Sequence, residues 1–101
     1  MITSVRTANM NDGKIEAGFI WAVKVAAYIS KKFSVDMQAV RNVGGLMGQV
    51  HWIARFDSLA DYDAVMKKIS NDEGYLNFFK EVAEQRLFDA GSLADKIYET
   101  I

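Results

Sequence analysis

The sequence contains no cysteine and no proline, and only one of its 101 residues is a histidine. The absence of cysteine excludes disulfides and thiolate chemistry. A single histidine is too few for a metal site built from several imidazoles. The absence of proline is typical of a compact chain without stiff linkers. We therefore expect neither a metal nor a bound cofactor.

A strong charge of either sign is also missing, since 12 basic and 13 acidic residues leave a net charge of -1. Nucleic-acid-binding domains usually carry a basic surface, so we expect no nucleic acid partner. The longest apolar stretch, Ile15–Ile29, contains Glu16 and Lys24. It is shorter than the ~20 residues of a spanning helix, so we expect no membrane association. The first residues lack the basic and then apolar pattern of a signal peptide, which predicts a cytoplasmic protein.

Half of the residues are hydrophobic and a quarter are charged, as in ordinary globular proteins. The length predicts one domain over residues 1–101. Hydrophobic periodicity and turn residues predict the order β-α-β-β-α-β. The predicted strands are Ile2–Met10, Ser34–Val43, Leu46–Phe56 and Asp95–Ile101, and the predicted helices are Lys14–Phe33 and Leu59–Phe88 with a restart at Ser70–Asp72. This order indicates an α+β, ferredoxin-like fold, with two helices on one face of a four-stranded antiparallel sheet.

Alternation along the predicted strands separates two faces of the sheet. The third strand places Val50, Trp52, Ala54 and Phe56 under the helices, and Gln49, His51, Ile53 and Arg55 on the opposite face. We assign Ser4, Arg6, Ala8 and Met10 of the first strand and Gln38, Val40 and Asn42 of the second strand to this opposite, mixed face. A half-apolar face is suited to pairing with a second sheet around a partly polar cavity, so we expect a homodimer.

The predicted first helix is apolar nearly all round. One stripe consists of Ile15, Phe19, Ala22, Ala26, Ile29 and Phe33. Ile20, Trp21, Val25 and Tyr28 lie off this stripe, and helices of this kind are usually buried on more than one side. We interpret Trp21, Val25 and Tyr28 as contacts to a partner; the alternative is that Trp21 and Tyr28 cover loops of their own subunit.

Three short segments carry a family resemblance: the aromatic, Ser-Leu and helix of Phe56–Tyr62, the Asp and aromatic of Asp72–Tyr75 with Phe78-Phe79, and the closing Gly91–Tyr98. With the element order, they resemble the dimeric α/β-barrel superfamily, and more narrowly a NIPSNAP-like or antibiotic-monooxygenase-like domain. The resemblance implies that two subunits pack their sheets into a barrel lined by the mixed faces. The sequence departs from the pattern because no proline follows Asp72, and because Ala54 replaces an expected tryptophan while Trp52 lies two residues earlier.

The candidate site lies in this barrel interior. His51 and Arg55 are four residues apart on one strand, roughly 13 Å, so they line one pocket without contacting each other. As catalytic residues, His51 would be the acid or base and Arg55 would hold an enolate or carboxylate. The alternative is that His51 is an interface residue and Arg55 pairs with a carboxylate across the dimer. The predicted ligand-binding residues are Arg6, Met10, Val40, Ile53 and Tyr98.

Three functions stay open at this stage. The first is a homodimer that binds a small, partly apolar molecule in the barrel cavity. The second is a cofactor-independent monooxygenase-like enzyme in the same cavity. The third is a protein-interaction module that uses the Trp21, Val25 and Tyr28 surface. Related haem-degrading members place an Asn on the first strand, a Trp on the third and a His on the second helix; Asn9 and Trp52 fit, but the second helix has no His, which disfavours haem degradation.

Overall fold

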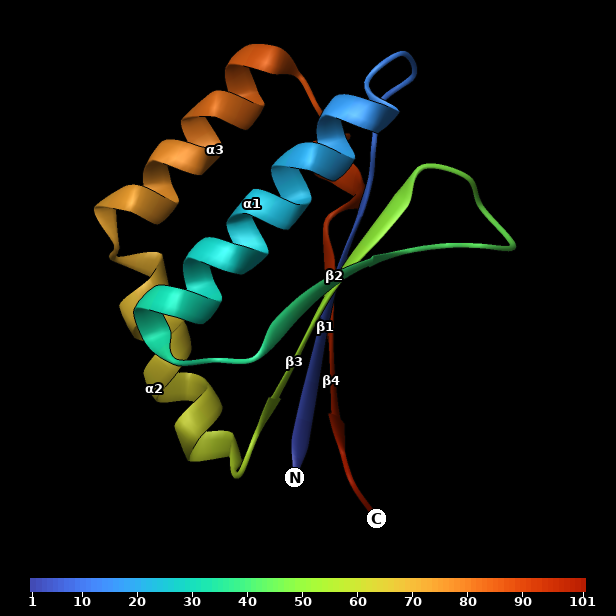
Figure 1. Ribbon diagram of the computed structural model, residues 1–101. Coiled ribbons are helices and arrows are strands. Elements are labelled where there is room, and N and C mark those ends of the chain that lie inside the picture. Colours follow the sequence, from blue (N-terminus) through green and yellow to red (C-terminus); the bar gives the residue numbers. More distant parts are fainter.

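The computed structural model describes residues 1–101 and places the three α-helices on one face of a four-stranded antiparallel sheet (Figure 1). The strand order is β2-β3-β1-β4. The elements are β1 (Ile2–Asn9), α1 (Ile15–Phe33), β2 (Met37–Arg41), β3 (Gln49–Phe56), α2 (Leu59–Ser70), α3 (Glu73–Gln85), the short 3-10 helix η1 (Ala90–Ser92) and β4 (Ala94–Glu99). This arrangement confirms the predicted ferredoxin-like α+β order, with the second helix divided into α2 and α3.

Two side-chain caps explain where these helices begin. The Ser58 hydroxyl accepts a hydrogen bond from the Asp61 backbone N–H at 3.1 Å and starts α2. The Asp72 carboxylate accepts from the Tyr75 backbone N–H at 3.0 Å and starts α3. Each cap satisfies an N–H that has no partner inside its helix. The restart at Asp72 changes the helix direction, so α2 and α3 follow the sheet as two separate rods (Figure 1).

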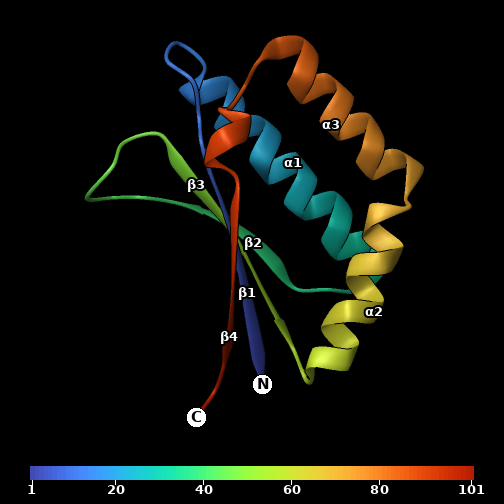
Figure 2. The same ribbon diagram turned by 180° about the vertical axis from the view of Figure 1, so that it is seen from behind.

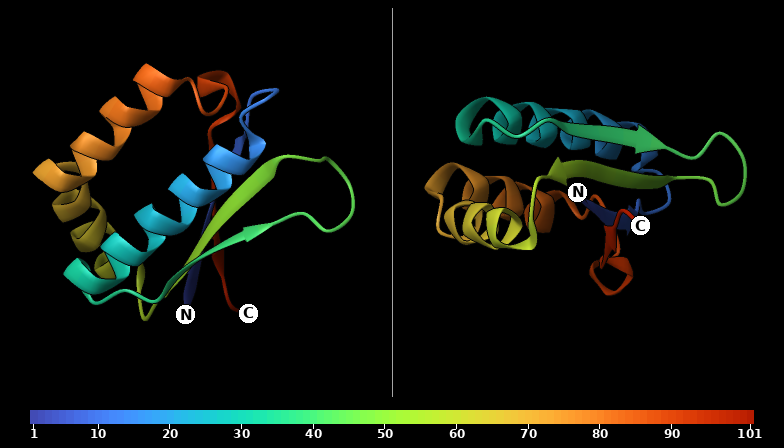
Figure 3. Two further views of the ribbon diagram at one scale, coloured as in Figure 1. Left: turned by 45° about the horizontal axis from the view of Figure 1, so that its top comes forward. Right: turned by 90° about the horizontal axis from the view of Figure 1, so that it is seen from below.

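The connection between β2 and β3 is longer than the two-glycine hairpin that the sequence suggests. The strands end at Arg41 and resume at Gln49, and Gly45 and Gly48 adopt positive φ angles of 82° and 79°. Positive φ is a conformation that glycine adopts without steric cost. Figure 3 shows this connection as an arm that projects from the body of the domain. Its apolar side chains are exposed, namely Val43, Leu46 and Met47.

The core lies between the sheet and the helices, and Trp21 of α1 is at its centre. Its ring packs edge-on against Trp52 of β3 at 5.8 Å between centroids. Its centroid also lies 5.8 Å from that of Phe88, and it contacts Phe78 and Phe79 of α3. Aromatic rings bury large apolar areas, so this cluster joins α1, α3 and β3 into one unit. Figure 2 shows that no helix covers the opposite face of the sheet.

The burial of α1 corrects one hypothesis from the sequence. Trp21 and Val25 are buried within their own chain, and the Tyr28 hydroxyl donates to the Asp72 carboxylate at 2.5 Å. The proposed interaction surface formed by Trp21, Val25 and Tyr28 is therefore wrong, because α3 and the sheet cover two sides of this helix. The exposed large apolar residues of this helix are Ile15, Ile20 and Val23. None of the helices has the length and apolar character needed to span a membrane.

Candidate functional site

Strand pairing divides the seven predicted site residues between the two faces of the sheet. Val40 of β2 lies opposite His51 of β3, and His51 lies opposite Thr7 of β1. Val50 and Trp52, the neighbours of His51 along β3, are buried under the helices. His51 and its cross-strand partners therefore point to the uncovered face of the sheet. We call it the outer face. Five predicted site residues share it: Val40, His51, Ile53, Arg55 and Tyr98.

Arg6 and Met10 lie on the other face, which corrects their assignment to the mixed face. Arg6 pairs with Trp52 across the β1–β3 ladder, and both point toward the helices. Met10 is buried against Gly18 of α1, where a Cβ would overlap the Met10 sulfur. The polar Ser4 and Arg6 made this side of β1 look like the mixed face. Their parity is nevertheless that of the buried Ile2, Ala8 and Met10.

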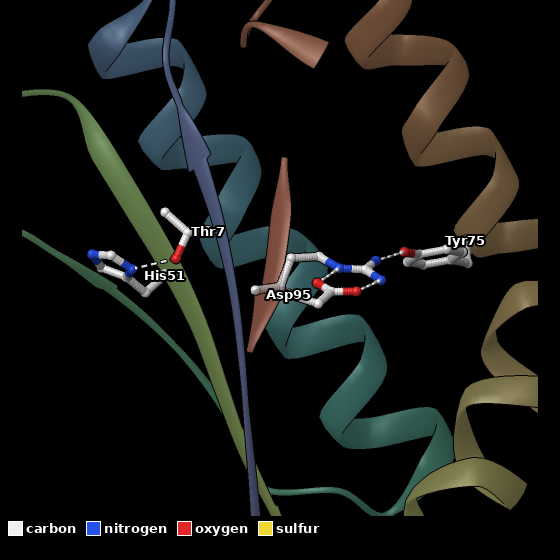
Figure 4. A network of polar contacts seen from close by, with 5 residues as sticks. Thr7, His51, Tyr75 and Asp95 are labelled. Atoms are coloured by element: carbon white, nitrogen blue, oxygen red, sulfur yellow. Dashed lines mark hydrogen bonds and ion pairs between the residues drawn. The ribbon is translucent and has the colours of Figure 1, made fainter. Parts of the chain in front are cut away.

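On the outer face, His51 belongs to a chain of hydrogen bonds (Figure 4). Its Nδ1 lies 2.7 Å from the Thr7 hydroxyl and its Nε2 lies 2.7 Å from Asn42 Oδ1. The Asn42 amide nitrogen donates to the Leu46 carbonyl oxygen and to Gln49 Oε1. Asn42 Oδ1 is then an acceptor, so His51 Nε2–H donates to it, and in the neutral imidazole Nδ1 accepts from the Thr7 hydroxyl. Both ring nitrogens are occupied within the chain.

Arg55, the other predicted catalytic residue, is exposed on the same face. It forms no ion pair within the chain, whose salt bridges are Arg6–Asp95 and Lys32–Asp72. The outer face thus combines a satisfied polar chain around His51 with a free guanidinium and the apolar side chains of Val40 and Ile53. A surface of this kind is suited to contact with another protein surface.

A pocket opens on the helix-covered side, between the sheet, α1 and the α2–α3 pair. Its volume is about 50 Å³, and 13 of its 17 lining residues are hydrophobic. A cavity that holds one water molecule has a volume of about 10–15 Å³, so this pocket has room for a small group rather than a large ligand. A second hollow of about 340 Å³ adjoins it and shares Arg6, Tyr62 and Tyr75 with it. The apolar walls of the pocket include Trp21, Val25, Ile29, Trp52, Phe79 and Phe88.

Arg6 is the polar centre of this pocket. Its Nε and Nη2 donate to the two carboxylate oxygens of Asp95 at 2.7 and 2.9 Å, and its Nη1 donates to the Tyr75 hydroxyl at 2.9 Å. Figure 4 shows Asp95 of β4 and Tyr75 of α3 on either end of this contact. A bidentate arginine–carboxylate pair is both strong and directional. Three elements distant in the sequence therefore meet at one guanidinium.

The ionisation of these groups follows from their contacts. The hydrogen bond with Arg6 lowers the pKa of Asp95, and the same pair raises the pKa of Arg6. Burial raises the pKa of Tyr75, with a smaller opposing effect of Arg6. At neutral pH the pocket therefore holds a guanidinium, a carboxylate and a protonated phenol. The chain has no cluster of three or more potential metal ligands among its His, Asp and Glu side chains.

Sequence reasoning missed Asp95 and Tyr75 as partners of Arg6. They lie 89 and 69 residues away along the chain, so no local pattern links the three. One signal was available for Asp95: in a ferredoxin-like sheet β4 pairs with β1, and that register puts Asp95 opposite Arg6. Tyr75 depends on the approach of α3 to the sheet, which the sequence does not specify.

Known structures share this architecture. No protein-family model and no curated protein sequence matches the chain. An uncharacterised NIPSNAP domain protein from Burkholderia xenovorans superposes with a TM-score of 0.81 at 12% identity, covering 100% of this chain and 95% of that one. A NIPSNAP family protein of unknown function from Agrobacterium tumefaciens gives 0.80 at 20% identity, covering 99% and 87%.

A third neighbour, from Deinococcus radiodurans, is described as a candidate antibiotic biosynthesis monooxygenase. It superposes with a TM-score of 0.73 at 14% identity, covering 100% of this chain and 93% of that one. Identities this low establish a common fold and leave chemistry open. The predicted resemblance is thus confirmed at the level of the fold: the chain has the ferredoxin-like architecture of NIPSNAP and antibiotic-monooxygenase-like domains.

Proposed function

We propose that this protein binds a small, mainly apolar molecule in the pocket between its sheet and its helices, and that it does so as a homodimer. The observation that carries the binding proposal is the composition of the pocket: mostly apolar walls with one convergent polar group, the Arg6–Asp95–Tyr75 contact. Binding sites for small molecules usually have this combination, in which apolar walls supply affinity and a few polar atoms fix orientation.

The size of the pocket limits which part of a ligand it can hold. A volume of about 50 Å³ accepts a short alkyl group, since a cavity that holds a benzene ring is ~150 Å³. The adjoining hollow accommodates the ring and whatever else projects past Arg6 and Tyr75. Trp21 and Trp52 form part of the wall, and their indole N–H groups donate to the carbonyl oxygens of Phe78 and Ala22. Their rings are held in place, so the pocket is largely preformed.

The homodimer proposal rests on the outer face. The side chains of Val40 and Tyr98 are exposed there at 38% and 51%, and Ile53 is half-buried. The apolar arm extends from the ends of β2 and β3 (Figure 3). A second copy that pairs sheet against sheet would cover these residues, and standard interfaces bury ~800 Å² per partner. In this arrangement His51 and Arg55 belong to the interface and the barrel interior, and the ligand pocket lies outside it.

Ligand binding is tested by titrating ethylbenzene, an apolar single-ring probe, and following the two tryptophan indole N–H resonances by NMR. We expect saturable shifts of both resonances. The variant Ser4→Phe places a ring into the pocket from β1 and is expected to abolish the shifts. Thr3→Phe is the matched control, since it lies one position away on the outer face and should leave binding intact. Equal binding by both variants would remove the pocket as the site.

The assembly is tested by sedimentation velocity. A dimer is expected for the unmodified chain, and Ile53→Asp should give monomers because it puts a charge into the proposed interface. Ile20→Asp changes an exposed isoleucine on α1 and should leave the dimer unaffected. A monomer at all concentrations, or equal behaviour of the two variants, would contradict the proposed interface.

A second candidate function is oxygenation in the same pocket without a cofactor, which the candidate monooxygenase among the structural neighbours favours. The test is oxygen consumption with hydroxyarenes such as 1-naphthol, with no metal or flavin added. Turnover that Ser4→Phe abolishes and Thr3→Phe retains would support this candidate. The absence of turnover across the panel leaves binding alone as the proposed function.

A further inference from the structure

The Tyr75 hydroxyl has a proton that is free for a further hydrogen bond. Its oxygen accepts a hydrogen bond from Arg6 Nη1, and no group of the chain accepts the phenolic proton in return. A hydroxyl that is held by a donor in this way offers its own O–H to whatever occupies the space beside it. Tyr75 lines both the pocket and the adjoining hollow, so that space is the ligand site. Burial keeps the phenol protonated, because it raises the pKa of Tyr75.

The guanidinium of Arg6 does not give the pocket a free positive charge. Asp95 neutralises it through two parallel hydrogen bonds, to Nε and to Nη2. The other charged residue in the wall, Lys96, pairs with Val5 across the β1–β4 ladder and therefore points to the outer face. An anionic ligand would meet a carboxylate as closely as it meets the guanidinium, so the local charge balance is near zero.

We propose that the pocket selects ligands that carry a neutral oxygen acceptor, such as a ketone or aldehyde carbonyl, beside an apolar ring, and that it discriminates against carboxylates. Tyr75 donates the recognising hydrogen bond, and Arg6 and Asp95 hold Tyr75 in place. This inference rests on the proposed function, since it names the ligand class of that same pocket. A neutral hydrogen bond of this kind raises affinity by about 3- to 10-fold.

Three probes of similar size separate the possibilities: acetophenone has the carbonyl, ethylbenzene lacks it and benzoate carries a charge. Dissociation constants are measured from the indole N–H shifts of Trp21 and Trp52. For the unmodified protein we expect acetophenone to bind about 3- to 10-fold more tightly than ethylbenzene, and benzoate to bind most weakly. Tyr75→Phe should make acetophenone and ethylbenzene equal without weakening ethylbenzene. Tyr98→Phe, which removes a phenol on the outer face, should retain the preference.

A charge variant tests the second half of the inference. Asp95→Asn releases the Arg6 charge and is expected to raise the affinity for benzoate above that for ethylbenzene. The inference is overturned if benzoate is the tightest ligand of the unmodified protein, or if Tyr75→Phe leaves the ratio of acetophenone to ethylbenzene unchanged. In both cases ethylbenzene still binds, so the proposed binding function survives. If ethylbenzene and acetophenone both fail to bind, the binding function and this inference fall together.

Discussion

Replacing Gly18 with alanine tests the close packing of Met10 against α1. Gly18 lies in the interior of α1, where alanine normally stabilises a helix by about 1 kcal/mol. A Cβ at this position would overlap the side chain of Met10, which is itself buried at 7% exposure. Overpacking of this kind costs about 1–3 kcal/mol. We therefore expect Gly18→Ala to lower the free energy of unfolding by about 0–2 kcal/mol, the difference of these two terms.

In a protein that already carries Met10→Ala, Gly18→Ala should raise the free energy of unfolding instead of lowering it. Met10→Ala removes the Met10 sulfur and Cγ, and leaves a Cβ at an ordinary distance from position 18. Gly18→Ala should then stabilise by about 1 kcal/mol, which gives a coupling of about 1–3 kcal/mol between the two sites. Urea unfolding of the four proteins measures the cycle. An equal effect of Gly18→Ala in both backgrounds would refute the packing of Met10 against α1.

Three further predictions concern stability and are checked by urea unfolding. Leu87→Ala should cost about 2–5 kcal/mol because Leu87 is only 1% exposed, and a cost below 1 kcal/mol would contradict its burial. Ser58→Ala should cost about 1 kcal/mol through loss of the α2 cap, with no change in the indole resonances. Lys32, Tyr28 and the cap lower the pKa of Asp72 from 3.8 to about 2, so its stabilisation is complete above pH 3.8 and is lost as the pH falls through 2. Asp72→Asn should flatten this part of the pH profile, and an unchanged slope would show that Asp72 does not stabilise the fold.

The sequence predicted the element order and the faces of β3, because Val50, Trp52, Ala54 and Phe56 alternate without interruption. The faces of β1 were harder to predict. A strand with Ser4 and Arg6 on its buried side looks polar there, and the partners that satisfy Arg6 come from distant elements. Local alternation contains no information about those partners.

The all-round apolar character of α1 was a genuine signal with two physical explanations. A partner chain and a second layer of the same chain both bury a helix on more than one side. The second explanation holds for Trp21, which contacts α3 and β3 at once. Which one applies depends on where α3 packs, and that follows from the break at Asp72. The contribution of β2 and β3 to the outer face was predictable because it depends on strand parity alone, whereas the helix-side pocket depends on the packing of three elements.

The central claim is that the ligand site lies under the helices and not on the outer face. Intermolecular nuclear Overhauser effects between bound acetophenone and the assigned protein test it directly. We predict contacts from acetophenone to the side chains of Trp21 and Trp52, and to the side chains around Tyr75. Contacts to His51, Ile53 or Val40 in their place would put the ligand in the barrel interior and contradict the account.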